Sequence, residues 1–189
     1  LKKIIVPAAY LIPPQFSDMI DVIKSHSINF NILNTNKKLK VEKYRFTNVK
    51  FAPRPYEGRQ LPSFQCNSFS EWIEIEAGTL IVYTNQRQLR VIINLLEPEA
   101  PDSFVSWGFF NAFFERKEYA EAYVMEPYAK QMIKDNPDLR SELYKKLNDD
   151  ESFRNNEGER LDFFYKRSPF YDKGENVYPI MRLINKSNI

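Results

Sequence analysis

The chain has 189 residues, and its 27 basic and 25 acidic side chains give a formal net charge of +2. This balance argues against a nucleic-acid-binding protein, which normally carries a clustered basic face. No apolar run approaches the roughly 20 residues that a membrane span requires. With only five Gly and no G-x-G-x-x-G or Walker-type loop, a dinucleotide- or phosphate-binding loop is also excluded.

The first part of the chain predicts a β-sheet with one flanking helix. An apolar run predicts a strand over residues 2–11, and apolar residues at i, i+3, i+4 and i+7 predict a helix from near Pro14 to Ser25. Alternation predicts a strand over residues 28–32, so the chain opens with a strand–helix–strand unit. Further strands are predicted over residues 39–51, 69–77 and 80–83, with a proline-bounded loop over 54–62.

The second half predicts mainly helices. A cap at Thr84 or Asn85 precedes a stripe that ends at Leu96, and residues 103–114 predict a further helix. Two more helices are predicted, over residues 117–134 with a kink at Pro127 and from Asn136-Pro137 onward. We expect a mobile loop over residues 148–159 and a last strand over 177–184.

These elements indicate an α+β fold. We expect a mixed β-sheet with a flanking helix in the N-terminal half and a mainly helical C-terminal half packed on it. The predicted subdomains are residues 1–84 and residues 85–189, which together would form one compact unit. A chain of this length buries roughly 70% of its unfolded surface, so its core needs no disulfide.

The scarcity of histidine and cysteine limits the chemistry that the chain can perform alone. Its one histidine, His26, lies at a predicted helix end, where a cap or a packed side chain is expected. Its one cysteine, Cys66, lies in a predicted loop and is expected to be a structural thiol. Catalytic zinc takes three protein ligands, often histidines, and the common Ser-His and Cys-His solutions would depend wholly on His26.

The segment from Leu95 to Phe114 carries the strongest candidates for a functional site. Glu97 and Asp102 could act as paired carboxylates in acid–base chemistry. A structural interpretation is favoured, in which Asp102-Ser103 caps a helix and Glu97 binds a loop backbone. Five aromatic residues could form a sugar platform or an interface, although a helical core stripe is the simpler explanation: Trp107, Phe109, Phe110, Phe113 and Phe114. The candidate residues facing a partner or a cleft are Glu97, Asp102, Trp107, Phe109 and Phe110.

Several segments of the chain resemble the C-terminal region of bacterial, Bacteroidetes-type zinc carboxypeptidases of the M14 family. They are Pro7–Pro13, Val22–Ile28, Ala77–Val82, Leu95–Pro98, Asp102–Ser103, Trp107–Phe110, Leu161–Tyr165 and Tyr178–Pro179. The resemblance implies hydrolysis of C-terminal peptide bonds at a zinc held by two histidines and a glutamate, beginning with an H-x-x-E motif. Here His26 is followed by Ser27, Ile28 and Asn29. None of the family's metal or catalytic residues can therefore be transferred to this chain.

The resemblance implies that this chain is a non-catalytic accessory region, with zinc bound by the parent's catalytic domain and no cofactor in the chain itself. Its partner would be its own catalytic domain, and the protein would be periplasmic or secreted. We expect the start at Leu1 to be a processed end or a fragment boundary.

Two alternatives remain open. The first is an independent glycan- or peptide-binding module that uses an exposed Trp72 or Trp107 together with scattered arginines. The second is a metal-independent hydrolase that uses Glu97 and Asp102.

Overall fold

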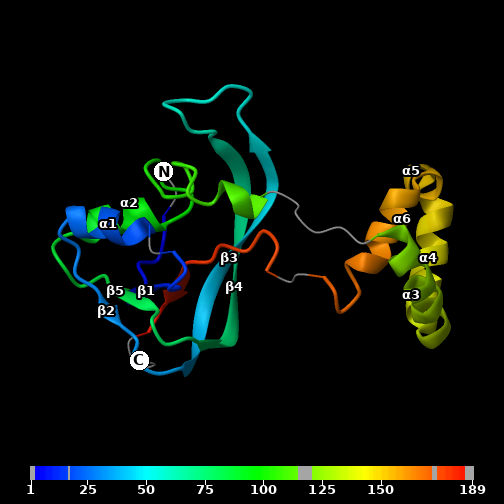
Figure 1. Ribbon diagram of the computed structural model, residues 1–189, viewed down its shortest axis with the longest axis horizontal. Coiled ribbons are helices and arrows are strands. Elements are labelled where there is room, and N and C mark those ends of the chain that lie inside the picture. Colours follow the sequence, from blue (N-terminus) through cyan, green and yellow to red (C-terminus); the bar gives the residue numbers. More distant parts are fainter. Residues whose placement is uncertain (1–2, 17, 115–120, 172–173, 186–189) are drawn as a thin grey trace. The chain divides into compact units, whose positions relative to one another are not determined.

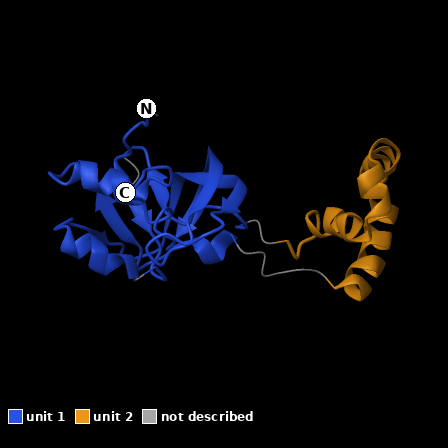
Figure 2. Cartoon of the chain, turned by 90° about the horizontal axis from the view of Figure 1, so that it is seen from above, with its two compact units in different colours: residues 1–115, 174–189 blue, residues 116–173 orange. Residues whose placement is uncertain are grey.

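The computed structural model describes residues 3–16, 18–114, 121–171 and 174–185. The chain divides into two compact units, shown in Figure 2: residues 1–115 with 174–189, and residues 116–173. The helical unit is thus inserted between two parts of the sheet-containing unit. This division differs from the predicted boundary after residue 84, because the sheet also needs residues from the C-terminal end of the chain.

The sheet-containing unit is built on six strands in the order β2-β5-β1-β6-β3-β4 (Figure 1). The strands are β1 (Ala9–Ile12), β2 (Asn31–Ile32), β3 (Lys37–Phe51), β4 (Pro62–Ile75), β5 (Leu80–Tyr83) and β6 (Met181–Leu183). The helices of this unit are α1 (Asp18–Ser25), α2 (Leu89–Leu96) and the short 3-10 helix η1 (Asn111–Phe114). The α+β class is confirmed.

All described strand pairs are antiparallel, so the expectation of a mixed sheet was wrong. β1 and β2 both pair with β5 and therefore run parallel to each other on its two sides. The predicted strand–helix–strand unit is present, but β5 separates its two strands. β6 enters between β1 and β3, which ties the end of the chain into the sheet formed by the first 84 residues.

A bend joins β2 to β3 and β4 to β5, and the two bends stay hydrogen-bonded to each other. The Leu33 N–H donates to the Thr79 carbonyl at 2.9 Å, and the Gly78 N–H donates to the Leu33 carbonyl at 2.8 Å. The four strands therefore form one long bent hairpin, with β2 and β3 in one arm and β4 and β5 in the other. In the sheet, β1 and β6 lie between β5 and β3. The sheet is consequently curled, which gives its two faces different coverings.

Each face of the curled sheet buries its own apolar cluster. Side chains alternate along β1, so Tyr10 and Ile12 join the cluster that contains residues of α1 and α2. Ala9 and Leu11 join a second cluster formed almost entirely by residues of the sheet and its bends. Burying one Leu-sized side chain contributes roughly 1.5–3 kcal/mol, so both clusters stabilise the curl.

The inserted unit consists of α3 (Ala122–Asp135), α4 (Pro137–Asp149), α5 (Glu151–Asn155) and α6 (Glu157–Tyr165). The last three helices begin with side-chain caps at Asn136, Asp150 and Asn156. Each cap accepts a hydrogen bond from a backbone N–H of the first turn, at 3.0–3.1 Å. This unit has a separate apolar core, which includes Met125 and Phe153.

Several local predictions were wrong. Residues 103–110 form turns that end in η1, and no continuous α-helix spans 103–114. The expected mobile loop over residues 148–159 instead contains α5 and the start of α6, because Asp150 and Asn156 act as caps. The α2 helix starts at Leu89, not after a cap at Thr84, whose hydroxyl donates to the Pro7 carbonyl at 2.6 Å.

The remaining elements agree more closely with the prediction. β4 begins earlier than expected, so Cys66 lies in a strand and not in a loop. The predicted helix start at Asn136-Pro137 is confirmed, as are a strand within 177–184 and a helix that contains Pro127. Residues 117–120 of the predicted helix over 117–134 lie outside the described residues.

Candidate functional site

Glu97 is a buried carboxylate at the C-terminal end of α2. Its backbone N–H donates to the Ile93 carbonyl at 3.0 Å, and the following Pro98 cannot continue the helix. The chain therefore turns at Glu97, and the side chain lies inside the protein with only 4% of the residue exposed. A buried charge requires partners, since burying an unpaired one is very costly.

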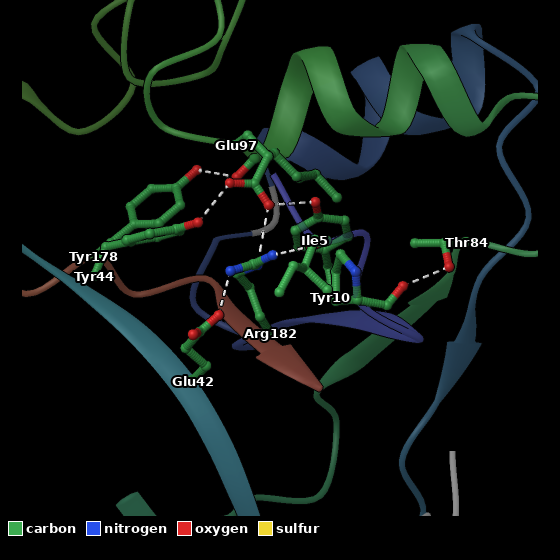
Figure 3. Close-up of polar contacts among 10 residues, drawn as sticks. Ile5, Tyr10, Glu42, Tyr44, Thr84, Glu97, Tyr178 and Arg182 are labelled. Carbon is green, nitrogen blue, oxygen red and sulfur yellow. Dashed lines mark hydrogen bonds and ion pairs between the residues drawn. The ribbon is translucent and has the colours of Figure 1, made fainter. Parts of the chain in front are cut away.

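Three side chains from the sheet supply these partners, and Figure 3 shows them directed at Glu97. The Tyr10 hydroxyl donates to Oε1 at 2.6 Å, and the Tyr44 hydroxyl donates to Oε2 at 2.8 Å. The Arg182 Nε lies 3.0 Å from Oε1, but its N–H is not aligned with that oxygen, so this contact is an ion pair and not a hydrogen bond. The partners come from β1, β3 and β6, which are neighbours in the sheet only after folding.

Arg182 connects the network to a second carboxylate and to the N-terminal segment. Its Nη1 pairs with Glu42 on β3, its Nη2 donates to the Ile5 carbonyl, and its guanidinium lies 5.4 Å from the centre of the Tyr44 ring. The residue is only 5% exposed. One buried cation therefore bridges two carboxylates, an arrangement suited to the planar guanidinium group.

The tyrosines of this region are held in their protonated form. Burial, followed by the negative charge of Glu97, raises the pKa of Tyr10 and of Tyr44 far above the ordinary value for tyrosine. Burial also raises the pKa of Tyr178, whose hydroxyl donates to the Leu96 carbonyl at 3.1 Å. Because all three keep their protons, they act as hydrogen-bond donors and not as bases.

The hydrogen-bonding and charge requirements of this network are largely met from within the protein. Each oxygen of Glu97 accepts a tyrosine hydrogen bond, and the Arg182 guanidinium contacts both carboxylates. In the part of the chain that the structure describes, no group of three or more His, Cys, Asp or Glu side chains could hold a metal ion. The arrangement therefore supports a structural role, in which the network locks α2 onto three strands.

The other candidates from the sequence lie in different places. Asp102 is exposed and lines a hollow of about 400 Å³ together with the half-buried Trp107 and the exposed Tyr56. Phe109 is half-buried, whereas Phe110 is fully buried and contacts the rings of Phe16, Phe113 and Tyr178. Glu97 is not among the residues lining the hollow, so the structure gives no sign that it works with Asp102 as a catalytic pair.

The structure also shows the positions of the single histidine and the single cysteine. His26 is exposed, and its backbone N–H donates to the Val22 carbonyl at the end of α1. Cys66 is a half-buried residue of β4.

The partners of Glu97 were missed by sequence reasoning because they are 53 to 87 residues away along the chain. One signal was available: Arg182 is a single charge within the apolar run from Tyr178 to Ile184. A charge at the centre of a buried strand is normally paired, so Arg182 could have indicated a buried acidic partner, although not which one.

Parts of this chain are similar to fungal proteins named carboxypeptidase 2. The chain is 32% identical over 102 residues to those of Trichophyton tonsurans and Trichophyton equinum, and 31% identical over 102 residues to that of Trichophyton rubrum. Each match covers 54% of this chain and 19% of the relative, so the chain spans about a fifth of the length of these curated relatives. No protein-family model and no solved structure matches the chain.

These relatives support a carboxypeptidase-related region, which agrees with part of the expected resemblance. They are fungal, so the expected bacterial, Bacteroidetes-type origin has no support. The described helices include none that is long and apolar enough to cross a membrane.

Proposed function

We propose that this chain is a non-catalytic region of a carboxypeptidase-like protein, and that it packs on the peptidase domain and supports it. The similarity to a short segment of much longer carboxypeptidases carries this proposal. In the M14-like form of the proposal, the zinc and its histidine ligands belong to the rest of the parent protein. The same resemblance motivates the proposal that the parent is secreted.

The buried network supports a structural role for this region. Glu97, one of the two carboxylates considered for acid–base chemistry, is enclosed by Tyr10, Tyr44 and Arg182 and is not free to act on a substrate. A catalytic acid or base must come within hydrogen-bond reach of the reacting group, which a side chain inside the core cannot do.

Deletion of this region from the full-length parent tests the proposal. We expect the truncated parent to keep a zinc site but to unfold at a lower temperature, because the surface that this region covers becomes exposed. Adding the separate chain back should restore part of the lost stability. A truncated parent with unchanged thermal stability, and no measurable affinity for the separate chain, would contradict the supporting role.

A second candidate function is an independent glycan- or peptide-binding module. The observation that favours it is the hollow beside Trp107, where Tyr56 is 58% exposed and Asp102 is also exposed. Aromatic faces with a nearby acceptor are suited to sugar rings or to extended peptides.

Iodide quenching of tryptophan fluorescence tests this alternative. Trp72 is 60% exposed, so we expect strong quenching in a Trp107→Phe variant. For ligand binding at the hollow, a Trp72→Phe variant should lose Trp107 quenching when a glycan or peptide is added. Titrations of both ligand classes that leave Trp107 quenching unchanged would remove the module from consideration.

A further inference from the structure

The strand β4 forms one edge of the sheet. It runs over 14 residues and, within the described part of the chain, pairs only with β3. Long edge strands invite pairing with another chain, and proteins usually protect them with lysine or proline. β4 has no basic residue, and its single proline is its first residue, Pro62.

Trp72 stands out on this edge because it is a large aromatic side chain that the fold leaves 60% exposed. Its register partner on β3 is Lys40, which is also exposed. Exposed tryptophans of this kind are enriched among the residues that dominate protein–protein interfaces. A strand added beside β4 would cover Trp72 on one face of the sheet.

The opposite face at the same place has a hollow of about 290 Å³. Ile73 and Ile75 of β4 line one side of it, and Pro14, Val177 and Met181 are among the residues lining the rest. Side chains alternate along a strand, so Trp72 and Ile73 point to opposite faces. An added strand would place one row of side chains beside Trp72 and the other row toward the hollow.

The charge of the β4 edge indicates the chemistry of the added strand. The C-terminal part of β4 carries Glu71 and Glu74, and Glu76 follows. On the side where β4 pairs with β3, lysines lie near two of these carboxylates. Lys38 lies opposite Glu74, and the Lys43 Nζ lies 3.1 Å from Glu71. Glu74 and Glu76 are nevertheless exposed, so a strand on the free side would meet these two carboxylates.

We propose that the free edge of β4 binds an extended polypeptide segment that combines basic and apolar side chains. The segment adds a strand to the sheet, with backbone hydrogen bonds for affinity, and with Trp72 and the hollow beside Ile73 for specificity. This inference does not rest on the proposed function, because the chain alone suffices to test it.

The test uses the Trp107→Phe variant, in which Trp72 is the remaining tryptophan. The probe is a synthetic peptide with the sequence of residues 37–45, KKLKVEKYR, which reproduces the strand that already pairs with β4. Titration should shift the Trp72 emission to shorter wavelength and saturate. We expect at least a tenfold weaker affinity for the same peptide with each lysine replaced by glutamate.

Two variants of equal charge change localise the binding. Glu74→Lys should weaken binding of the probe peptide at least tenfold, whereas Glu126→Lys, on the exposed surface of α3, should leave it unchanged. Circular dichroism confirms that both variants fold.

Three results would overturn the proposal. The first is no saturable change of Trp72 emission up to about 1 mM peptide. The second is equal binding of the charge-reversed peptide. The third is a dimer of the unliganded chain in which Trp72 is protected from iodide, because a second copy would then cover the edge.

Discussion

Arg182 and Glu97 show why a buried charge pair holds this fold together without adding much net stability. Taking both ions out of water costs several kcal/mol, which their attraction and hydrogen bonds roughly offset. Removing one partner is far more damaging, because the other charge stays buried and unpaired. The pair is therefore best tested by single and double substitution.

Replacing Arg182 by methionine should destabilise the sheet-containing unit by about 3–5 kcal/mol. The substitution keeps an apolar stem of similar length but leaves Glu97 buried without its cation. Urea unfolding followed by tryptophan fluorescence measures the loss, since both tryptophans lie in this unit.

The control for this substitution is Arg90→Met on the exposed side of α2, which should change stability by less than about 0.5 kcal/mol. The double variant Glu97→Gln/Arg182→Met should be more stable than the sum of the two single effects predicts. Additive effects would mean that Glu97 and Arg182 are not coupled.

Three of the buried tyrosines, Tyr10, Tyr44 and Tyr178, predict a loss of stability at alkaline pH. Above about pH 10 the tyrosines of the unfolded chain lose their protons, while Tyr10, Tyr44 and Tyr178 keep theirs in the folded state. The folded state then binds more protons, so stability is full below pH 10 and falls above it. The expected slope is about 1.4 kcal/mol per pH unit for each such tyrosine.

Urea unfolding at a series of pH values between 8 and about 11 measures this slope. Tyr44→Phe should make the slope shallower, whereas Tyr144→Phe, whose side chain is 58% exposed, should not. A stability that does not change across this range would contradict the buried, protonated state of the tyrosines.

At the scale of elements, the backbone path of the turns over residues 103–110 depends on Gly108. Gly108 has φ of +76°, and an added Cβ would lie 3.0 Å from the Asn111 Nδ2, which donates to the Gln60 carbonyl at 2.8 Å. Gly108→Ala should therefore cost about 1–3 kcal/mol.

Gly158 provides the contrasting substitution, since it lies in α6 without a positive φ. Gly158→Ala should raise stability by up to about 1 kcal/mol. Hydrogen exchange of amides in β3 and α6 reports on the two units separately. Equal effects of the two substitutions would show that the backbone conformation at Gly108 is not the cause.

The sequence predicted elements well where periodicity and local caps act together. Asn136-Pro137 specified the start of α4, and the apolar run at Leu80 specified β5. The predictions failed where a single residue overrides the pattern around it. Gly108 interrupts the helix predicted over residues 103–114, and the caps Asp150 and Asn156 start helices in a stretch predicted to be a loop. The network around Glu97 was not predictable, because it is assembled from distant strands by the sheet topology.

At the scale of the whole molecule, each unit has its own core. The two clusters of the sheet-containing unit use only residues up to 114 and from 178 onward, and the third cluster uses only residues 125–171. Phe113 and Gly174 line the same hollow, so the two ends of the insertion site lie close together.

Replacing residues 116–173 by a Gly/Ser linker of about eight residues, which spans on the order of 16 Å, should therefore leave the sheet-containing unit folded. Unchanged iodide quenching of Trp107 in a Trp72→Phe background, together with cooperative urea unfolding, would show this. Loss of cooperative unfolding would mean that the helical unit is needed for the sheet to fold.

The most direct test of the account is to measure the zinc content and carboxypeptidase activity of this chain alone and of its full-length parent. We predict activity and about one zinc per molecule in the parent, and neither in the chain, whose described residues include no metal-binding group. Stoichiometric zinc or peptide hydrolysis by the isolated chain would contradict the proposal that this region is non-catalytic.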